Sequence, residues 1–274
     1  MLDVEYVRVR TLDIRSMQIA WQVADTYEEV LDYQFRILRS EGPAGPWDEL
    51  SDWFTDKFQF RDSAVEPFHL HRTMNYIIRV KHIKSGMTKD FGPYTADDQP
   101  DLIALEVRRH WDVKLRELMG RRSWFFPVRT FGTTCRNCYD NTQQVVTSSR
   151  CPSCYSTGFV RGFHHPIEIY AQFMPTPKNL NLGPEVRQES PNLVYMSAFP
   201  EAKPKDLIVS PDNRRWRVVS VKRTERLGCP LHQELTVAEC ARGDIEFDVP
   251  VNFQALMSAP LAEERNFRYR TTIG

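Results

Sequence analysis

Apolar and polar residues alternate along much of the first hundred positions, the pattern of β-strands with one buried face. The clearest runs place apolar side chains mostly at every second position. They are Ile14, Met17, Ile19, Trp21 and Val23, then Tyr33, Phe35 and Ile37, then Phe58 and Phe60, and then Met74, Tyr76, Ile78 and Val80. A Gly/Pro-rich turn at residues 41–46 separates the second run from the third. Residues 1–96 are therefore predicted to form a β-sandwich.

One helical pattern follows, between residues 97 and 122. Asp97, Asp98, Pro100 and Asp101 form an acidic start, and Gly120 marks the end. Apolar side chains recur at spacings of three and four, with charged residues between them. The apolar positions are Ile103, Val107, Trp111, Leu115 and Leu118, and the charged ones are Glu106, Arg108, Arg109, Lys114, Arg116 and Glu117. The apolar stripe predicts contact with the core, and a helix between two modules also suits a partner surface.

Alternation returns after residue 165 and predicts a small β-barrel or open roll over residues 166–250. The predicted strands cover residues 166–174, 193–197, 206–210, 216–222 and 234–240, with an irregular loop at 175–191 and a hairpin turn at Pro211–Arg214. Residues 244–250 are expected to be extended. The polar end of the chain, residues 251–274, is predicted to form an extended arm that a neighbouring chain orders.

Four cysteines carry the one constellation with a specific chemistry. Cys135-x-x-Cys138 and Cys151-x-x-Cys154 are separated by twelve residues. Two such knuckles place four thiolates at the corners of a tetrahedron, which is the geometry that Zn²⁺ accepts in structural sites. A redox pair or two disulfides would not need this matched spacing. Residues 123–165 are thus predicted to form a zinc ribbon in which strands before and after the knuckles pair around the metal.

A complete set of four sulfur ligands leaves no open position for water or substrate, so a structural metal is favoured over a catalytic one. The polar linker 139–150 has too few apolar residues for a core, so the metal must supply most of its folding free energy. His164 and His165 are expected to be turn or surface residues that do not bind the metal. Cys229 and Cys240 are expected to be buried free thiols.

Composition sets limits on the class of protein. A chain of 274 residues with 41% hydrophobic and 12% aromatic content can build cores for two or three modest domains. Its 36 basic and 36 acidic residues balance, so no overall field attracts nucleic acid or an anionic membrane. No apolar run approaches the length of a membrane span, and the first residues lack a signal-peptide pattern. A soluble protein made in the cytoplasm is expected.

The first 96 residues resemble a fibronectin type III domain. The resemblance rests on Ile19-Ala-Trp21, on Tyr33–Ser40 followed by Gly-Pro-Trp47, on Leu70 leading into Tyr76–Val80, and on Phe91-Gly-Pro-Tyr94 as a last strand. Domains of this family are mostly adhesive or spacing modules. The resemblance therefore implies a β-sandwich that contacts other proteins and has no catalytic role.

Residues 201–240 are similar to a unit of the small β-barrel head-to-tail connector proteins of tailed bacteriophages. The matching segments are Lys203–Val209, Pro211–Val219 and His232–Val237. The resemblance implies a structural virion protein, a subunit of the neck, collar or connector ring, assembled in the host cytoplasm. It also implies a homo-oligomeric ring and contacts with portal, tail terminator, collar or fibre proteins.

Two other classes of function are weighed against this one. The chain has no Gly-rich phosphate loop, nucleophile elbow, His-Glu-x-x-His motif or recognisable carboxylate pair, so we do not expect an enzyme. Zinc ribbons often present basic hairpins to DNA or RNA, and six arginines surround this one. They are Arg121, Arg122, Arg129, Arg136, Arg150 and Arg161. Nucleic-acid binding is therefore the alternative hypothesis.

Overall fold

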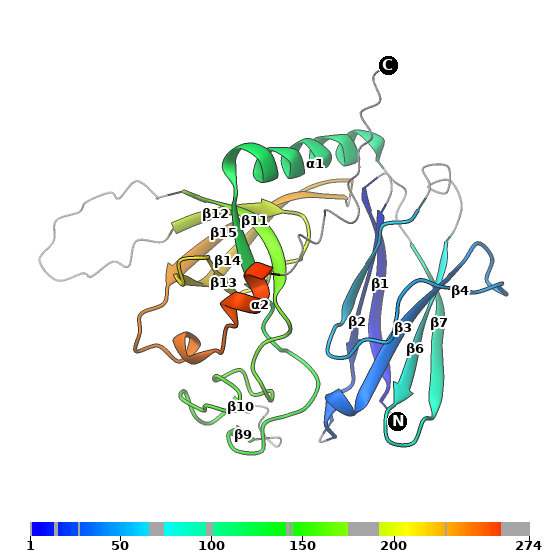
Figure 1. The fold of residues 1–274 in the computed structure, drawn as a ribbon, viewed down its shortest axis with the longest axis horizontal. Coiled ribbons are helices and arrows are strands. Elements are labelled where there is room, and N and C mark those ends of the chain that lie inside the picture. Colours follow the sequence, from blue (N-terminus) through cyan, green and yellow to red (C-terminus); the bar gives the residue numbers. More distant parts are fainter. Residues whose placement is uncertain are drawn as a thin grey trace, which may run out of the picture.

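The chain folds into two β modules, bridged by one long helix and by a small cysteine-bearing segment (Figure 1). The computed structural model describes residues 2–13, 16–26, 28–65, 74–96, 101–140, 143, 145–174, 192–227 and 229–258. Strands dominate these residues, so the predicted mainly β fold class is confirmed. The loop predicted at 175–191, the helix-start residues 97–100 and the last part of the predicted arm, 259–274, lie outside the described residues.

The N-terminal module consists of two antiparallel sheets, with strand orders β1-β2-β5 and β4-β3-β6-β7. The strands are β1 (Val4–Asp13), β2 (Ser16–Val23), β3 (Tyr33–Ser40), β4 (Asp48–Glu49), β5 (Gln59–Asp62), β6 (Asn75–His82) and β7 (Thr88–Thr95). Both sheets contribute inward side chains to one core, among them Trp21, Phe35, Ile37, Tyr76 and Ile78. The sheets thus have the arrangement of a β-sandwich, and membership of the fibronectin type III family stays a prediction.

The sequence pattern does not predict β1, because a bulge interrupts its alternation. The register of β1 against β2 shifts between Glu5 and Arg8. Tyr6, at the bulge, has a φ of 48° and is 78% exposed. A bulge adds one residue to a strand, so apolar positions on its two sides no longer share a period of two.

Helix α1 (Leu102–Lys114) begins at Asp101, whose side chain accepts a hydrogen bond of 3.0 Å from a first-turn N–H. A π-helical turn (Leu115–Met119) extends the helix to Gly120. A Cβ at Gly120 would lie 2.1 Å from a carbonyl oxygen of that turn, so the helix ends where it was predicted to end. No helix in the described part of the chain is long and apolar enough to cross a membrane.

The prediction that the apolar stripe of this helix is buried is wrong at three positions. Ile103, Val107 and Leu118 are 60%, 39% and 78% exposed. The buried residues are Ala104, Leu105, Arg108 and Leu115, and they include an arginine expected on the charged face. Small Ala104 permits a close approach to the sheets, so the face of Ala104 and Arg108 turns inward and the opposite face, with Leu118, stays exposed. Trp111 keeps the expected core contact, because its ring stacks on His232 at 4.3 Å.

The C-terminal module is a closed barrel with the strand order β11-β12-β15-β14-β13-β8, as the small-barrel prediction requires. Its strands are β8 (Arg121–Phe126), β11 (Ile167–Met174), β12 (Asn192–Ser197), β13 (Leu207–Val209), β14 (Arg215–Arg226) and β15 (Cys229–Glu239). Alternate side chains fill the interior, including Phe125, Val194, Trp216 and Leu235. Strand β8 closes the barrel by pairing with both β11 and β13.

The prediction that residues 123–131 and 158–163 pair as strands around the metal is confirmed only in part, because they pair without forming a regular two-stranded ladder. The first segment starts in β8 and belongs to the barrel. Phe125 lies in the barrel core, whereas Trp124 and Phe126 belong to a second core on the outside of β8. A strand buried on both faces loses the polar alternation that would have marked it as a barrel strand. Two isolated antiparallel bridges join the second segment to the residues before the knuckles, with further backbone hydrogen bonds such as Arg129 N–H to the Gly162 carbonyl at 2.8 Å.

The chain after the barrel covers this outer core. Residues 244–250, expected to be extended, contain a short 3-10 helix (Ile245–Asp248). The predicted arm starts as helix α2 (Phe253–Ser258) rather than as an extended segment. The reason is apolar contact, since the ring of Phe253 lies 6.0 Å from that of Trp124.

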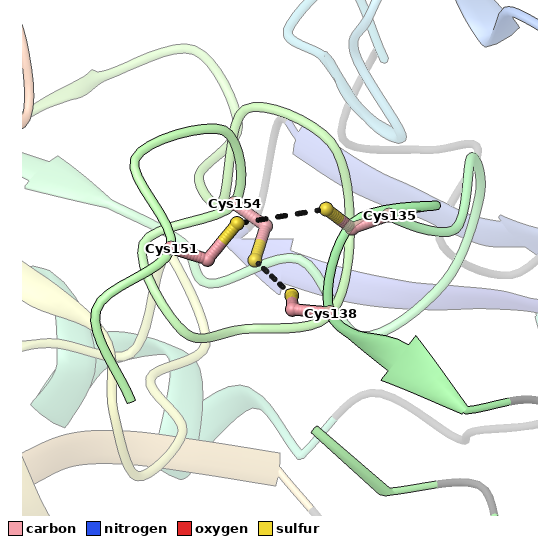
Figure 2. A group of neighbouring side chains, drawn as sticks. All are labelled: Cys135, Cys138, Cys151 and Cys154. Carbon is pink, nitrogen blue, oxygen red and sulfur yellow. Dashed lines mark hydrogen bonds between the residues drawn. The ribbon is translucent and has the colours of Figure 1, made fainter. Parts of the chain in front are cut away.

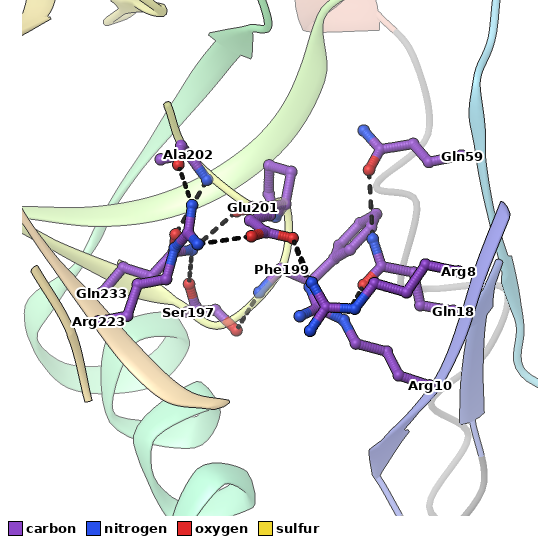
Figure 3. A network of polar contacts seen from close by, with 11 residues as sticks. Arg8, Arg10, Gln18, Gln59, Ser197, Phe199, Glu201, Ala202, Arg223 and Gln233 are labelled. Atoms are coloured by element: carbon purple, nitrogen blue, oxygen red, sulfur yellow. Dashed lines mark hydrogen bonds and ion pairs between the residues drawn. The ribbon is translucent and has the colours of Figure 1, made fainter. Parts of the chain in front are cut away.

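Three arginines converge on Glu201 where the sandwich meets the barrel (Figure 3). Arg8 and Arg10 of β1 lie 3.6 Å and 3.3 Å from its carboxylate, and Arg223 of β14 lies 2.7 Å away. Arg10 is buried and donates a hydrogen bond of 2.8 Å to Gln18. Burial lowers the pKa of Arg10, and the charge of Glu201 opposes that shift. One carboxylate thus ties the two β modules together.

A second ion pair, Asp56–Arg129, joins the sandwich to the cysteine-bearing segment. The two side chains are 4% and 6% exposed, and Arg129 Nη2 lies 2.6 Å and 2.5 Å from the carboxylate oxygens. Arg129 Nε also donates to the Phe163 carbonyl at 3.0 Å. Asp56 has a φ of 58°, in the left-handed region that Asp and Asn tolerate better than most residues. Removing either partner would leave a buried charge without a counter-charge.

The substitution Asp56→Asn is expected to lower the free energy of unfolding by about 3 kcal/mol, because Arg129 stays buried without its counter-charge. Asn tolerates the same backbone conformation, so the change mainly removes the charge. Urea unfolding followed by tryptophan fluorescence measures the loss. The matched control Asp90→Asn breaks the ion pair of Asp90 with Arg79. The Arg79 and Asp90 side chains are 33% and 42% exposed. It should cost less than about 1 kcal/mol, and equal losses in both variants would contradict the prediction.

Candidate metal centre

Two matching turns hold the four cysteines. The Tyr139 N–H donates to the Cys135 carbonyl at 3.0 Å, and the Tyr155 N–H donates to the Cys151 carbonyl at 2.8 Å. Each Cys-x-x-Cys pair therefore occupies one turn with the same hydrogen-bond span. A short hairpin of β9 (Tyr139–Asp140) and β10 (Val145–Val146) connects the two knuckles.

Two glycines allow the backbone to fold closely around the second knuckle. Gly158 and Gly162 have φ values of +87° and +67°. A Cβ on Gly162 would lie 2.7 Å from the Cys154 carbonyl oxygen, and one on Gly158 would lie 2.9 Å from the Tyr139 ring. The Gly158 carbonyl also accepts a hydrogen bond of 2.8 Å from the Cys135 N–H, which links the two knuckles. The spacing of the cysteines does not single out these glycines; their position just after the second knuckle was the available signal.

The four sulfur atoms converge on one point (Figure 2). All lie within 4.8 Å of one another, and all four residues are buried. The Cys135–Cys151 and Cys138–Cys154 sulfur pairs are 3.8 Å and 3.1 Å apart. A tetrahedral ion with metal–sulfur distances of about 2.3 Å needs sulfur–sulfur distances of about 3.8 Å. The predicted ligand set is thus brought together, and these residues fit a bound metal ion.

The ionisation of the thiols also favours a cation at this point. Burial raises the pKa of Cys138, and the neighbouring thiols raise it further. Burial also raises the pKa of Cys154. At Cys151 burial acts upward too, but the Ser153 N–H and the neighbouring thiols outweigh it and lower the pKa to about 7. Four thiolates at these distances repel one another strongly, so only a bound cation would allow all of them to ionise.

The two nearby histidines take no part in the cluster: among the described residues, the group able to hold a metal contains the four cysteines alone. His164, expected in a turn or at the surface, is half-buried, and its ring lies 5.1 Å and 5.3 Å from those of Phe58 and Phe131. Burial, and then the charge of Arg129, lowers the pKa of His164 well below its usual value. His165 is exposed, as expected.

The two remaining cysteines lie away from the centre; both are buried and form no disulfide, as predicted. Cys229 packs with Ala104 and Leu105 beneath α1. Cys240 belongs to the outer core of the barrel. The sequence therefore separates the metal ligands correctly from the structural thiols.

The six arginines expected around the ribbon do not form one patch. Arg121 and Arg122 lie on barrel strand β8, and Arg122 pairs with Glu168 at 2.9 Å. Arg129 is buried in its pair with Asp56. The other three, Arg136, Arg150 and Arg161, are exposed on the segment that carries the cysteines.

The segment that leads into the first knuckle is tied to the sandwich. The Thr26 N–H donates to the Gly132 carbonyl at 3.1 Å, and the Thr134 N–H donates to the Thr26 carbonyl at 3.2 Å. Phe131 belongs to the sandwich core and meets Phe58 edge to face at 4.9 Å. The metal centre is therefore joined directly to the N-terminal module.

The same segment is tied to the barrel by Asp206. This carboxylate is 1% exposed and accepts hydrogen bonds from the Val128 N–H at 2.7 Å and the Lys203 N–H at 2.5 Å. Burial raises the pKa of Asp206 to about 7, although the two N–H groups act to lower it. Phe163, after the second knuckle, packs in the outer core of the barrel. The ribbon thus contacts both modules.

Comparison with known proteins shows no relationship. No protein-family model matches the chain, no curated protein does, and no solved structure does. The functional assignment therefore depends on the residues described above.

The purified chain is expected to contain about one metal ion per chain, measured by elemental mass spectrometry. The variant Cys154→Ser should lose most of this metal, because it removes a fully buried ligand. Cys229→Ser, which changes a buried thiol outside the cluster, should retain it. Full metal content in Cys154→Ser would contradict the assigned ligand set.

The raised pKa of Asp206 makes the unfolding free energy depend on pH. The folded state binds the Asp206 proton more tightly than the unfolded state. The contribution of that proton to stability is therefore complete below pH 3.8 and is lost as the pH rises through about 7. The difference in unfolding free energy between the natural chain and Asp206→Asn should fall by up to about 1.4 kcal/mol per pH unit across this window. Urea titrations at several pH values measure it, and a constant difference would argue against the raised pKa.

Proposed function

We propose that this chain is a structural virion protein of a tailed bacteriophage, a subunit of the neck, collar or head-to-tail connector ring. In this role the barrel docks in a homo-oligomeric ring, the ribbon stiffens the junction, and the sandwich projects as decoration or binds a fibre. The neighbours of the chain are portal, tail terminator, collar or fibre proteins. The chain acts through binding energy and is not an enzyme. The metal is Zn²⁺, because a tetrahedral set of four thiolates is typical of structural zinc sites.

The placement of the connector-like segments carries this proposal. Lys203–Val209 ends in β13, Pro211–Val219 turns into β14, and His232–Val237 lies in β15. Strand β13 pairs with β14, and β14 pairs with β15. The segments that resemble connector proteins are therefore spatial neighbours, as one docking unit would require.

The coupling between the modules supports the same role. Glu201 joins the sandwich to the barrel, and the buried Asp56–Arg129 pair joins the sandwich to the ribbon. The metal centre lies in the segment that contacts both modules. A subunit that transmits force between neighbouring chains needs fixed internal geometry, and these contacts provide it.

The second candidate is a zinc-ribbon protein that binds nucleic acid. Its support is the exposure of Arg136, Arg150 and Arg161 on the ribbon. Pairing of Arg122 with Glu168 and of Arg129 with Asp56 reduces the positive charge available to phosphates. The chain as a whole is also neutral, so we place this function second.

Negative-stain electron microscopy of the chain, mixed with portal and tail terminator proteins encoded near its gene, tests the proposal. Rings that contain the chain are expected, because connector subunits assemble through head-to-tail contacts. A chain that stays free in these mixtures would contradict the virion role.

Oligonucleotide binding at several salt concentrations separates the two candidates. Steep loss of binding with rising salt, abolished by Arg136→Gln together with Arg150→Gln, would favour the nucleic-acid function. The virion function predicts weak binding that these substitutions leave unchanged. The matched control is Arg109→Gln, which removes an exposed arginine on α1, away from the ribbon.

A further inference from the structure

Helix α1 carries an apolar stripe that no described part of the chain covers. Ile103, Val107 and Leu118 are 60%, 39% and 78% exposed, and Leu102 and Val113 beside them are 54% and 49% exposed. Figure 1 shows α1 on the outside of the molecule, across one end of the barrel and beside the sandwich. Its opposite face packs mainly on β15. An exposed apolar stripe of this length is typical of a contact with another chain.

Leu118 continues the stripe at the end of the helix, within the π-helical turn. Ile103 and Val107 are four residues apart and lie on one face of an α-helix. Leu118 follows Val107 by eleven residues, about three helical turns, so it lies near the same face. Its 78% exposure agrees with this placement. Such turns occur frequently at functional sites, so the turn is a second sign that this face binds a partner.

We propose that the partner is a second copy of this chain and that the two α1 helices pack antiparallel. The stripe is complementary to itself. A two-fold axis midway between Ile103 and Leu118 places Ile103 against the second copy's Leu118. The same axis places Val107 against the aliphatic stem of the second copy's Lys114.

The exposed charges beside the stripe suit the same arrangement. Glu106 and Lys114 are on the outer side of α1, and the Glu106 side chain is 44% exposed. Within the helix, Glu106 pairs with Arg109 at 3.4 Å and lies 3.7 Å from His110. The Lys114 ammonium lies 5.7 Å from the Trp111 ring, so both side chains would have to share or exchange these partners in the pair. In the antiparallel pair, Glu106 comes within reach of the second copy's Lys114. The two-fold axis repeats this contact, so two ion pairs of opposite charge border the apolar stripe. A parallel pair would place Glu106 beside Glu106 and would repel.

Helix length sets the expected affinity. With its π turn, α1 is roughly 25 Å long, so pairing through this face alone buries less than the about 800 Å² per partner of a standard interface. We therefore expect a dissociation constant on the order of 10 μM. The contact closes at two copies, unlike the head-to-tail contact of a ring, so it does not depend on the proposed virion role.

Sedimentation equilibrium of the full chain over a wide concentration range tests the pairing. A monomer–dimer equilibrium is expected, and Leu118→Glu should weaken it at least roughly tenfold. The matched control is Met87→Glu, which changes a methionine that is 59% exposed between β6 and β7, and it should leave the equilibrium unchanged. A monomer at every concentration, or a dimer that Leu118→Glu does not weaken, would overturn the proposal.

Charge reversal tests the antiparallel geometry. Glu106→Lys and Lys114→Glu should each weaken the dimer, because each places like charges together at both contacts. The variant with both changes should recover to within about threefold of the natural chain. An equimolar mixture of the two single variants should also pair, since each chain then meets the opposite charge. Failure of both recoveries would exclude this geometry.

Discussion

Four sulfur atoms brought within 4.8 Å of one another constrain the whole molecule. They are ionised together only around a cation, and the residues between the knuckles have almost no apolar side chains from which to build a core. The segment that carries them also supplies Phe131 to the sandwich core and Phe163 to the outer core of the barrel. A metal bound to these sulfur atoms would therefore fix a conformation that both β modules share, and each module in turn holds one side of the cysteine cluster in place.

Charged residues complete this arrangement at the boundaries of the modules. Glu201 and the pair of Asp56 with Arg129 are contacts between residues far apart in the sequence. The Asp56–Arg129 pair is buried, and Glu201 is 25% exposed beside the buried Arg10, so a shifted interface would leave a buried charge without its counter-charge. The Asp56–Arg129 pair, together with the pair of Arg122 and Glu168, removes two of the six arginines that a nucleic-acid surface would need. Polar residues here specify how the modules fit together.

The sequence allowed correct prediction of those parts whose signal is local. The spacing of the four cysteines identified the ligand set, and period-two alternation identified most strands of both modules. Strand β8 escaped prediction as a barrel strand because Trp124, Phe125 and Phe126 are buried on both of its faces. Strand β1 escaped because a bulge breaks its alternation. In both cases a long-range contact or a local irregularity replaced the simple periodic signal.

Helix α1 and His164 show the other limit of sequence reasoning. Periodicity showed that α1 has apolar positions, but only the packed structure shows which face meets the sheets, since Ala104 and Arg108 turn inward while Ile103 stays exposed. His164 lies next to the last knuckle in the sequence, and its burial depends on Phe58 from the other module. Such surroundings depend on how distant segments pack.

The position of the ribbon within the barrel has a consequence for folding. Strands β8 and β11 are neighbours in the barrel, yet the chain between them runs from Phe126 to Ile167 and contains the whole metal site. Bringing the ends of a long connection together costs entropy that grows with its effective length. A metal that joins the two knuckles shortens that effective length before β8 and β11 meet. Metal capture in the nascent chain would thus precede and favour barrel closure, so metal supply during synthesis would influence the yield of folded protein.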